Sequence, residues 1–132
     1  MNKYRILLVD DEERLVQCLE LVLSLEGHNV TTAESGESAY RMIKELYENG
    51  ETIDLLITDI WMPGMSGLTL LDKLSQLNIK LTVLGITGFT EADTAAELTR
   101  KGLVGLISKP FKPEELLHRI NEIMNSKNAV ES

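Results

Sequence analysis

Short runs of Val, Ile and Leu alternate along the chain with segments in which apolar residues recur every three or four positions. The short runs are typical of strands buried on both faces of a parallel sheet. The longer segments are typical of helices that cover such a sheet with one apolar face. The pattern therefore predicts five strands, at residues 5–10, 30–33, 55–59, 82–86 and 105–108.

Five helices are predicted between and after these strands, at about residues 12–26, 36–49, 67–77, 90–100 and from 113 onward. Ser35 is the expected N-cap of the second helix, and Thr90 and Asp93 have the spacing of a capping box for the fourth. Glycines at 27, 50 and 102 mark helix ends, and Pro113 suits a first turn. The expected inward-facing residues are Leu15, Leu19, Val22, Leu23, Ala39, Met42, Ile43, Leu46, Tyr47, Leu70, Leu71, Leu74, Leu77, Leu116, Leu117, Ile120, Ile123 and Met124.

Alternating strands and helices predict an α/β fold with three layers, in which helices cover both faces of a doubly wound, five-stranded parallel sheet. The chain has 132 residues, which is the size of one domain, and no Pro/Ser-rich linker or internal repeat divides it. In sheets of this kind, ligands bind outside the carboxyl ends of the strands. Functional residues are therefore expected at those ends.

Composition narrows the expected partners. The net charge of −8 opposes non-specific attraction to nucleic acid or anionic lipid, so neither is expected as a direct partner. No apolar stretch has the length of a signal-peptide core or a membrane span, and we expect a cytoplasmic location. Cys18 lies within an apolar helical pattern and is predicted to be a buried, inert thiol. His28 and His118 have no metal-ligand spacing and are expected at the surface or an edge.

Five polar residues end or directly follow the predicted strands, where the carboxyl ends should meet: Asp10, Asp11, Asp59, Thr87 and Lys109. Each has a simpler interpretation by itself, such as a helix N-cap for Asp11 or a solvated charge for Lys109. Three carboxylates at one edge repel one another, and a like-charge pair ~4 Å apart costs about 4 kcal/mol at an effective dielectric constant near 20. A positive charge is therefore expected there.

Lys109 supplies one positive charge, and the remaining oxygen ligands suit a hard divalent cation, for which Mg²⁺ is the best candidate. A carboxylate beside a cation, a lysine and a hydroxyl can accept a phosphoryl group. Asp59 is the predicted nucleophile.

These residues resemble the receiver domain of two-component response regulators, over essentially the whole chain. The resemblance rests on the paired acids Asp10-Asp11, the acceptor and turn from Asp59 to Gly67, Thr87 after the fourth strand, and Lys109-Pro110-Phe111 after the fifth. It implies the flavodoxin-like strand order 2-1-3-4-5. It also implies a receiver domain over residues 1–126, and we expect residues 127–132 to fray.

The resemblance also implies a role for each site residue. Asp59 would accept phosphate from a sensor histidine kinase or a phosphotransfer protein. Mg²⁺ would be bound directly by Asp11 and Asp59, mainly through water by Asp10, and by the backbone carbonyl of Trp61. Phosphoryl oxygens would be held by the Lys109 ammonium, the Thr87 hydroxyl and the Gly88 backbone N–H, and the Lys109-Pro110 bond would be cis.

Movement of Thr87 toward the phosphoryl group would switch a face formed by the fourth helix, the fifth strand and the fifth helix. An output domain or downstream protein would bind this face, and phosphorylation-dependent homodimerisation is a further implied use. The domain would assist only its own phosphorylation and dephosphorylation, so we do not expect an enzyme.

The sequence departs from the usual receiver pattern at two positions. Leu106 stands where receivers carry Tyr or Phe, so the link between Thr87 and the fifth strand is expected to be weaker or carried by Phe89. Gly88 replaces a small Ala or Ser and should make its loop more mobile. Bulky Trp61 and Phe89 beside the phosphoryl position would exclude water, which predicts slow self-dephosphorylation. An equally good interpretation of Trp61 is that it packs against a neighbour or anchors a partner.

Other functions fit the residues less well. Phosphatases that use an aspartyl phosphate carry a second acid two residues after the nucleophile, and that position here is Trp61. A flavin-binding protein would need a loop of hydrogen-bond donors after the first strand, where residues 10–13 are all acidic. A nucleotide-hydrolysing glycine loop is missing from the sequence. A degenerate receiver that binds partners without phosphorylation is disfavoured by the intact set of five site residues.

Overall fold

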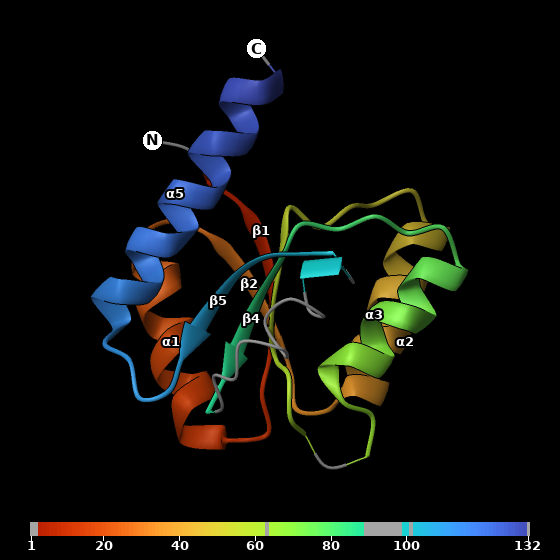
Figure 1. Cartoon of the computed structure of the whole chain (residues 1–132), viewed down its shortest axis with the longest axis horizontal. Helices are drawn as coiled ribbons and strands as arrows, with labels where there is room; N and C mark the ends of the chain where they lie inside the picture. The colour runs from red at the N-terminus through yellow and green to blue at the C-terminus, as the bar shows by residue number, and fades with distance from the viewer. Residues whose placement is uncertain (1–2, 63, 89–98, 101, 132) are drawn as a thin grey trace.

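Five parallel strands form one sheet in the order β2-β1-β3-β4-β5, which confirms the predicted fold and strand order (Figure 1). A computed structural model describes residues 3–62, 64–88, 99–100 and 102–131, with the backbone alone for 127–131. The strands are β1 (Arg5–Val9), β2 (Asn29–Ala33), β3 (Leu55–Asp59), β4 (Val83–Thr87) and β5 (Leu103–Ser108). Four of them differ from the predicted bounds by one or two residues at an end.

Helices α1 (Glu13–Leu25) and α5 (Pro113–Glu131) lie on one side of the sheet, and α2 (Gly36–Glu48) and α3 (Gly67–Gln76) lie on the other (Figure 1). The predicted helix at about residues 90–100 falls outside the described residues except at Thr99 and Arg100. Helix α5 reaches Glu131, and the expected fraying of 127–132 stays a prediction.

Local signals fix the helix ends. The Ser35 hydroxyl accepts a hydrogen bond from the backbone N–H of Ser38 at 3.1 Å, which confirms the predicted N-cap of α2. Gly27 and Gly50 follow α1 and α2 with φ of +94° and +78°, in the left-handed region that ends helices at little cost to glycine. After α3, Asn78 takes this role with φ of 58°.

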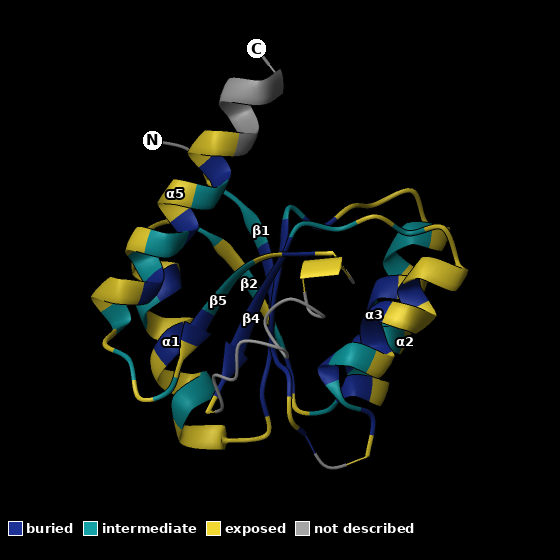
Figure 2. Ribbon diagram, in the orientation of Figure 1, coloured by how far each residue is buried: buried dark blue, intermediate teal, exposed yellow. Residues whose placement is uncertain are grey.

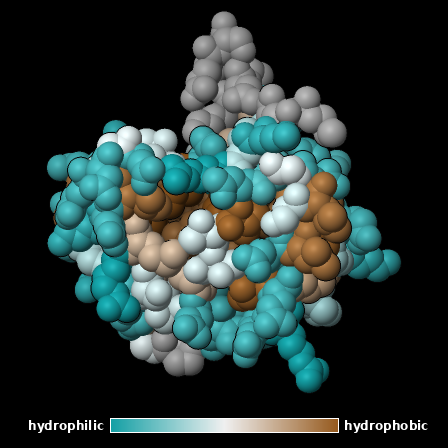
Figure 3. Space-filling view, turned by 180° about the vertical axis from the view of Figure 1, so that it is seen from behind, coloured by the Kyte–Doolittle hydropathy of each residue, from teal (hydrophilic) through white to brown (hydrophobic). Residues whose placement is uncertain are grey.

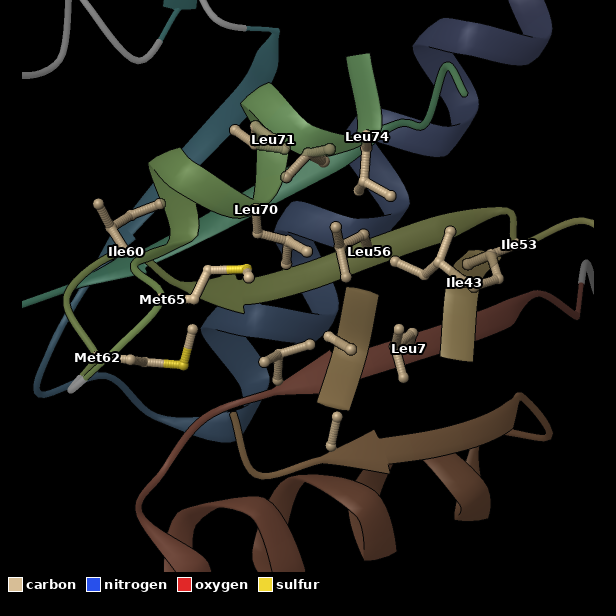
Figure 4. Packing of buried hydrophobic residues seen from close by; sticks show 14 of the residues in the cluster. Leu7, Ile43, Ile53, Leu56, Ile60, Met62, Met65, Leu70, Leu71 and Leu74 are labelled. Atoms are coloured by element: carbon tan, nitrogen blue, oxygen red, sulfur yellow. The ribbon is translucent and has the colours of Figure 1, made fainter. Parts of the chain in front are cut away.

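The sheet separates two hydrophobic cores (Figure 2). Successive β1 side chains alternate between them, because neighbouring residues of a strand point to opposite faces. Leu7 packs in the core under α2 and α3, and Leu8 packs in the core under α1 and α5. Figure 4 shows Leu7 and Leu56 of the sheet beside Ile43 of α2 and Leu70 of α3. Both cores hold the strands in the register that brings their carboxyl ends together.

Two predicted core residues lie at the surface. Cys18 is exposed, so the prediction of a buried thiol was wrong. The reason is the helical turn of about 100° per residue: Leu19 and Leu23 face the sheet, and Cys18 points away from it. Leu77, predicted to face inward, is the C-cap of α3 and is exposed.

On the face seen in Figure 3, hydrophilic residues lie mainly around the periphery, and hydrophobic residues form several patches across the middle and along one side. Within the described residues, no helix is long and apolar enough to cross a membrane.

Gly67 packs against the backbone at the end of β3. A Cβ atom at this position would lie 2.7 Å from the Asp59 carbonyl oxygen and 3.0 Å from Ile60 Cα. Both are backbone atoms, so the strand or the helix would have to move. We expect Gly67→Ala to lower the free energy of unfolding by about 1–3 kcal/mol, measured by urea denaturation.

Gly88→Ala is the matched control, because a Cβ there has no described atom within 4 Å. Its unfolding free energy should change by less than about 1 kcal/mol. Equal effects of the two substitutions would contradict the role assigned to close packing at Gly67.

Candidate functional site

The carboxyl ends of β1, β3, β4 and β5 bring all five predicted site residues to one edge, at the bottom of Figure 1. Asp10 and Asp11 directly follow β1, Asp59 and Thr87 end β3 and β4, and Lys109 follows β5. One carboxylate oxygen from each of the three aspartates lies within 4.8 Å of the others. The parallel register thus produces the acidic cluster that the sequence predicts.

Asp10 is the most deeply buried of the three acids, with 1% of its surface exposed. Its Oδ1 accepts a hydrogen bond from the backbone N–H of Glu12 at 2.9 Å. Its Oδ2 lies 3.1 Å from Lys109 Nζ, but outside hydrogen-bond geometry, and has no other partner among the described residues. Burial raises the pKa of Asp10, and the Asp59 carboxylate adds to the rise, against the lowering by the Glu12 N–H and Lys109.

Asp59 is held from both sides. Its Oδ1 accepts a hydrogen bond from the backbone N–H of Trp61 at 3.0 Å, and its Oδ2 accepts one from Lys109 Nζ at 3.1 Å. Only 5% of the residue is exposed. The Asp59 carboxylate is therefore fixed in orientation at the carboxyl edge of the sheet, between the acids after β1 and the lysine after β5.

Lys109 binds three carboxylates at once. Its Nζ lies 2.6 Å from Glu12 Oε1 and 3.1 Å from both Asp10 Oδ2 and Asp59 Oδ2. Burial alone would lower the pKa of Lys109, but these three carboxylates outweigh it and hold the pKa well above its usual range. The ammonium stays charged and offsets part of the repulsion among the acids.

Glu12 is a member of this cluster that the sequence analysis did not single out. It is the N-cap of α1, yet its side chain makes no capping hydrogen bond. The side chain instead contacts Lys109, which lies 97 residues away. Asp11 is not the N-cap, so that simpler interpretation of Asp11 is wrong. The sequence carried no distinct signal for this contact, because an acid at the start of a helix is ordinary.

The remaining predicted residues surround this centre. Thr87 is buried, and its carbonyl oxygen accepts a hydrogen bond from the Lys109 N–H at 2.7 Å, which ties the ends of β4 and β5 together. Gly88 and Asp11 are exposed. Trp61 is 51% exposed, and Phe89 lies outside the described residues. The Lys109-Pro110 bond is cis, as the resemblance implies.

The donor set fits a magnesium ion. Carboxylate oxygens are the ligands that Mg²⁺ prefers, and the buried Asp10 Oδ2 lacks a hydrogen-bond partner among the described residues. Asp11 is exposed and can coordinate without further desolvation. An acidic hollow of about 450 Å³ adjoins the cluster, lined by residues that include Asp10, Asp11, Glu13 and Glu20. A cation can therefore reach Asp10 and Asp11 from solvent.

A second cavity, of about 300 Å³, lies toward the opposite ends of the strands. Leu7, Met42, Leu46 and Ile53 contribute its apolar lining, and Arg5 is among its polar residues. It contains none of the predicted site residues. The chemistry expected from the sequence belongs to the carboxyl edge alone.

A family model described as "Response regulator receiver domain" matches residues 6–121. The cell cycle transcriptional regulator CtrA of Caulobacter vibrioides is 32% identical over 120 residues, which cover 91% of this chain and 50% of that protein. The response regulator SaeR of Staphylococcus epidermidis is 33% identical over 120 residues, covering 90% of this chain and 49% of that one. The chain spans about half the length of these curated relatives.

Solved structures agree with this match. A CheY-like response regulator receiver domain protein from Methanospirillum hungatei has a TM-score of 0.84 and 26% identity, with 97% of this chain and 98% of that chain covered. A chain of the CheX-CheY-BeF3-Mg²⁺ complex from Borrelia burgdorferi has a TM-score of 0.82 and 30% identity, with 92% and 89% covered.

The raised pKa of Asp10 leads to a prediction about the unfolding stability of the protein when EDTA keeps it free of metal. A folded-state pKa above the unfolded one gives stability that is present when the group is protonated and is lost as the pH rises through the folded pKa. Ionisation of Asp10 therefore lowers the stability of the metal-free protein. Asp10→Asn should raise the urea midpoint at pH 7, and its advantage should shrink as the pH falls below the raised pKa.

Asp11→Asn removes the same charge from an exposed neighbour and should change the midpoint less. An Asp10→Asn protein less stable than the wild type at pH 7 would show that the contact with Lys109 outweighs the burial of the charge.

Proposed function

The chain belongs to the response regulator receiver domain family, and on this premise we propose that Asp59 is the phosphoacceptor of a two-component signalling pathway. The observation that carries the proposal is the contact between Lys109 Nζ and Asp59 Oδ2 at 3.1 Å, inside a cluster with two further aspartates. A carboxylate held this way is oriented for attack, and the ammonium beside it is placed to stabilise the oxygens of the phosphoryl group that it would accept.

In the proposed reaction, an Asp59 oxygen attacks the phosphorus atom of a phosphohistidine on a sensor kinase or phosphotransfer protein. A P–O bond forms, and the P–N bond breaks with its electron pair returning to the histidine. Lys109 donates hydrogen bonds to the transferred phosphoryl oxygens. The Thr87 hydroxyl and the Gly88 backbone N–H are proposed as further donors, since both lie where β4 ends beside Asp59.

We propose that Asp10, Asp11, Asp59 and the Trp61 carbonyl hold Mg²⁺, with Asp10 acting mainly through water. The ion would neutralise charge that develops on the phosphoryl oxygens. Support comes from the buried Oδ2 of Asp10, and from the related CheY, which is described in a complex with BeF3 and Mg²⁺.

The proposed output face comprises β5, α5 and the fourth helix predicted at about residues 90–100, which lies almost wholly outside the described residues. Arg119 of α5 donates a hydrogen bond from Nη2 to the Leu106 carbonyl oxygen of β5 at 2.8 Å, which joins two parts of this face. Val104 of β5 is a large exposed apolar residue there. A shift of Thr87 would reach this face through its backbone contact with Lys109. An output domain, a downstream protein or a second copy would bind it.

We further propose that the chain is a regulatory domain and not an enzyme, and that it acts in the cytoplasm. The position two residues after Asp59 is Trp61, which cannot protonate a leaving group as a phosphatase acid would. Slow self-dephosphorylation, expected from Trp61 and Phe89, stays a prediction.

Intact-mass measurement after incubation with acetyl phosphate tests the proposal. We expect one added phosphoryl group with Mg²⁺ and none with EDTA. Without the metal ion, the three aspartates repel the anionic phosphodonor. Asp59→Asn should abolish the adduct.

Asp72→Asn, which alters an exposed acid on α3, is the control and should be phosphorylated like the wild type. An adduct that persists in Asp59→Asn would refute the assignment of Asp59. Continuous release of phosphate with no adduct would instead indicate an enzyme.

A further inference from the structure

Glu12 makes the shortest contact of the Lys109 ammonium, 2.6 Å from Oε1 to Nζ. Three carboxylates surround this ammonium, and two of them, Glu12 and Asp59, accept hydrogen bonds from it. A phosphoryl group on Asp59 would need at least one of its N–H donors. The phosphoryl group would therefore compete with these carboxylates for the ammonium.

The three carboxylates differ in how easily they can leave. The Asp10 and Asp59 side chains are 0% and 6% exposed, and both are fixed by backbone N–H groups. The Glu12 side chain is 60% exposed and has no capping bond to break. The Glu12 side chain can rotate into solvent, and its carboxylate is then hydrated and does not become a buried, unpaired charge. Glu12 is the exchangeable partner.

We propose that Glu12 is a positioning residue that holds Lys109 in the resting state and competes with the phosphoryl group for its ammonium. This inference rests on the proposed role of Asp59. The Glu12 contact draws Lys109 toward the N-terminus of α1, and binding of a phosphoryl group releases it. Glu12 thereby opposes the phosphorylated state and links occupancy of the site to the start of α1.

Competition predicts that removing Glu12 tightens the binding of a phosphoryl analogue. In saturating Mg²⁺, beryllofluoride should bind Glu12→Gln about three- to fivefold more tightly than the wild type, the range expected for loss of a partly exposed ion pair. Emission from Trp61, the sole tryptophan, reports binding.

Glu13→Gln is the matched control, since it removes the same charge one residue along without contact to Lys109 and should leave the affinity within about twofold. Glu12→Asp separates contact from charge. Its shorter side chain keeps the charge but loses the reach to Nζ, so it should bind the analogue as tightly as Glu12→Gln. Urea denaturation of each variant identifies any effect that comes from stability alone.

Weaker or unchanged binding by Glu12→Gln, relative to Glu13→Gln, would overturn the inference while the proposed function stands. Tighter binding by Glu12→Gln but not Glu12→Asp would also overturn it, in favour of a simple effect of net charge. Failure of the wild type to bind beryllofluoride would instead refute the proposed function, and the inference with it.

Discussion

The ion cluster around Lys109 is the interaction on which the rest of the site depends. Two buried aspartates face each other where β1 and β3 end, and only a cation between them makes that arrangement tolerable. Lys109 is 99 residues from Asp10 in the chain, so it reaches the acids only when β5 has joined β4 and the whole sheet is in register. Fold and site therefore form together, and the same ammonium that stabilises the resting cluster is available to a phosphoryl group.

Most of the fold could be predicted because its signals are local and agree with one another. Apolar runs located the strands, Ser35 marked the start of α2, and Gly27 and Gly50 marked helix ends. The wrong predictions of burial arose at the edge of a helix's apolar face, where the helical repeat of apolar residues does not show whether a side chain is buried. Cys18 is one residue away from the buried stripe of α1, and an apolar side chain there satisfies the pattern whether it faces inward or outward.

The site was predictable to the extent that strand ends converge in a parallel sheet. That rule placed Asp10, Asp59 and Lys109 together before any contact was known, and the distances of 3.1 Å bear it out. Glu12 was missed because its contact is with a residue distant in sequence and its position, at the start of a helix, has an ordinary meaning. Its failure to cap α1 is visible only in the structure, where the side chain is used for Lys109 instead.

The central claim is that the carboxylate at the end of β3 receives the phosphoryl group. Borohydride reduces an aspartyl phosphate to homoserine, so peptide sequencing of protein treated with acetyl phosphate, Mg²⁺ and borohydride identifies the modified residue. The account predicts homoserine at position 59 alone, two residues before Trp61. Homoserine in place of Asp10 or Asp11, or an adduct that resists reduction, would contradict it.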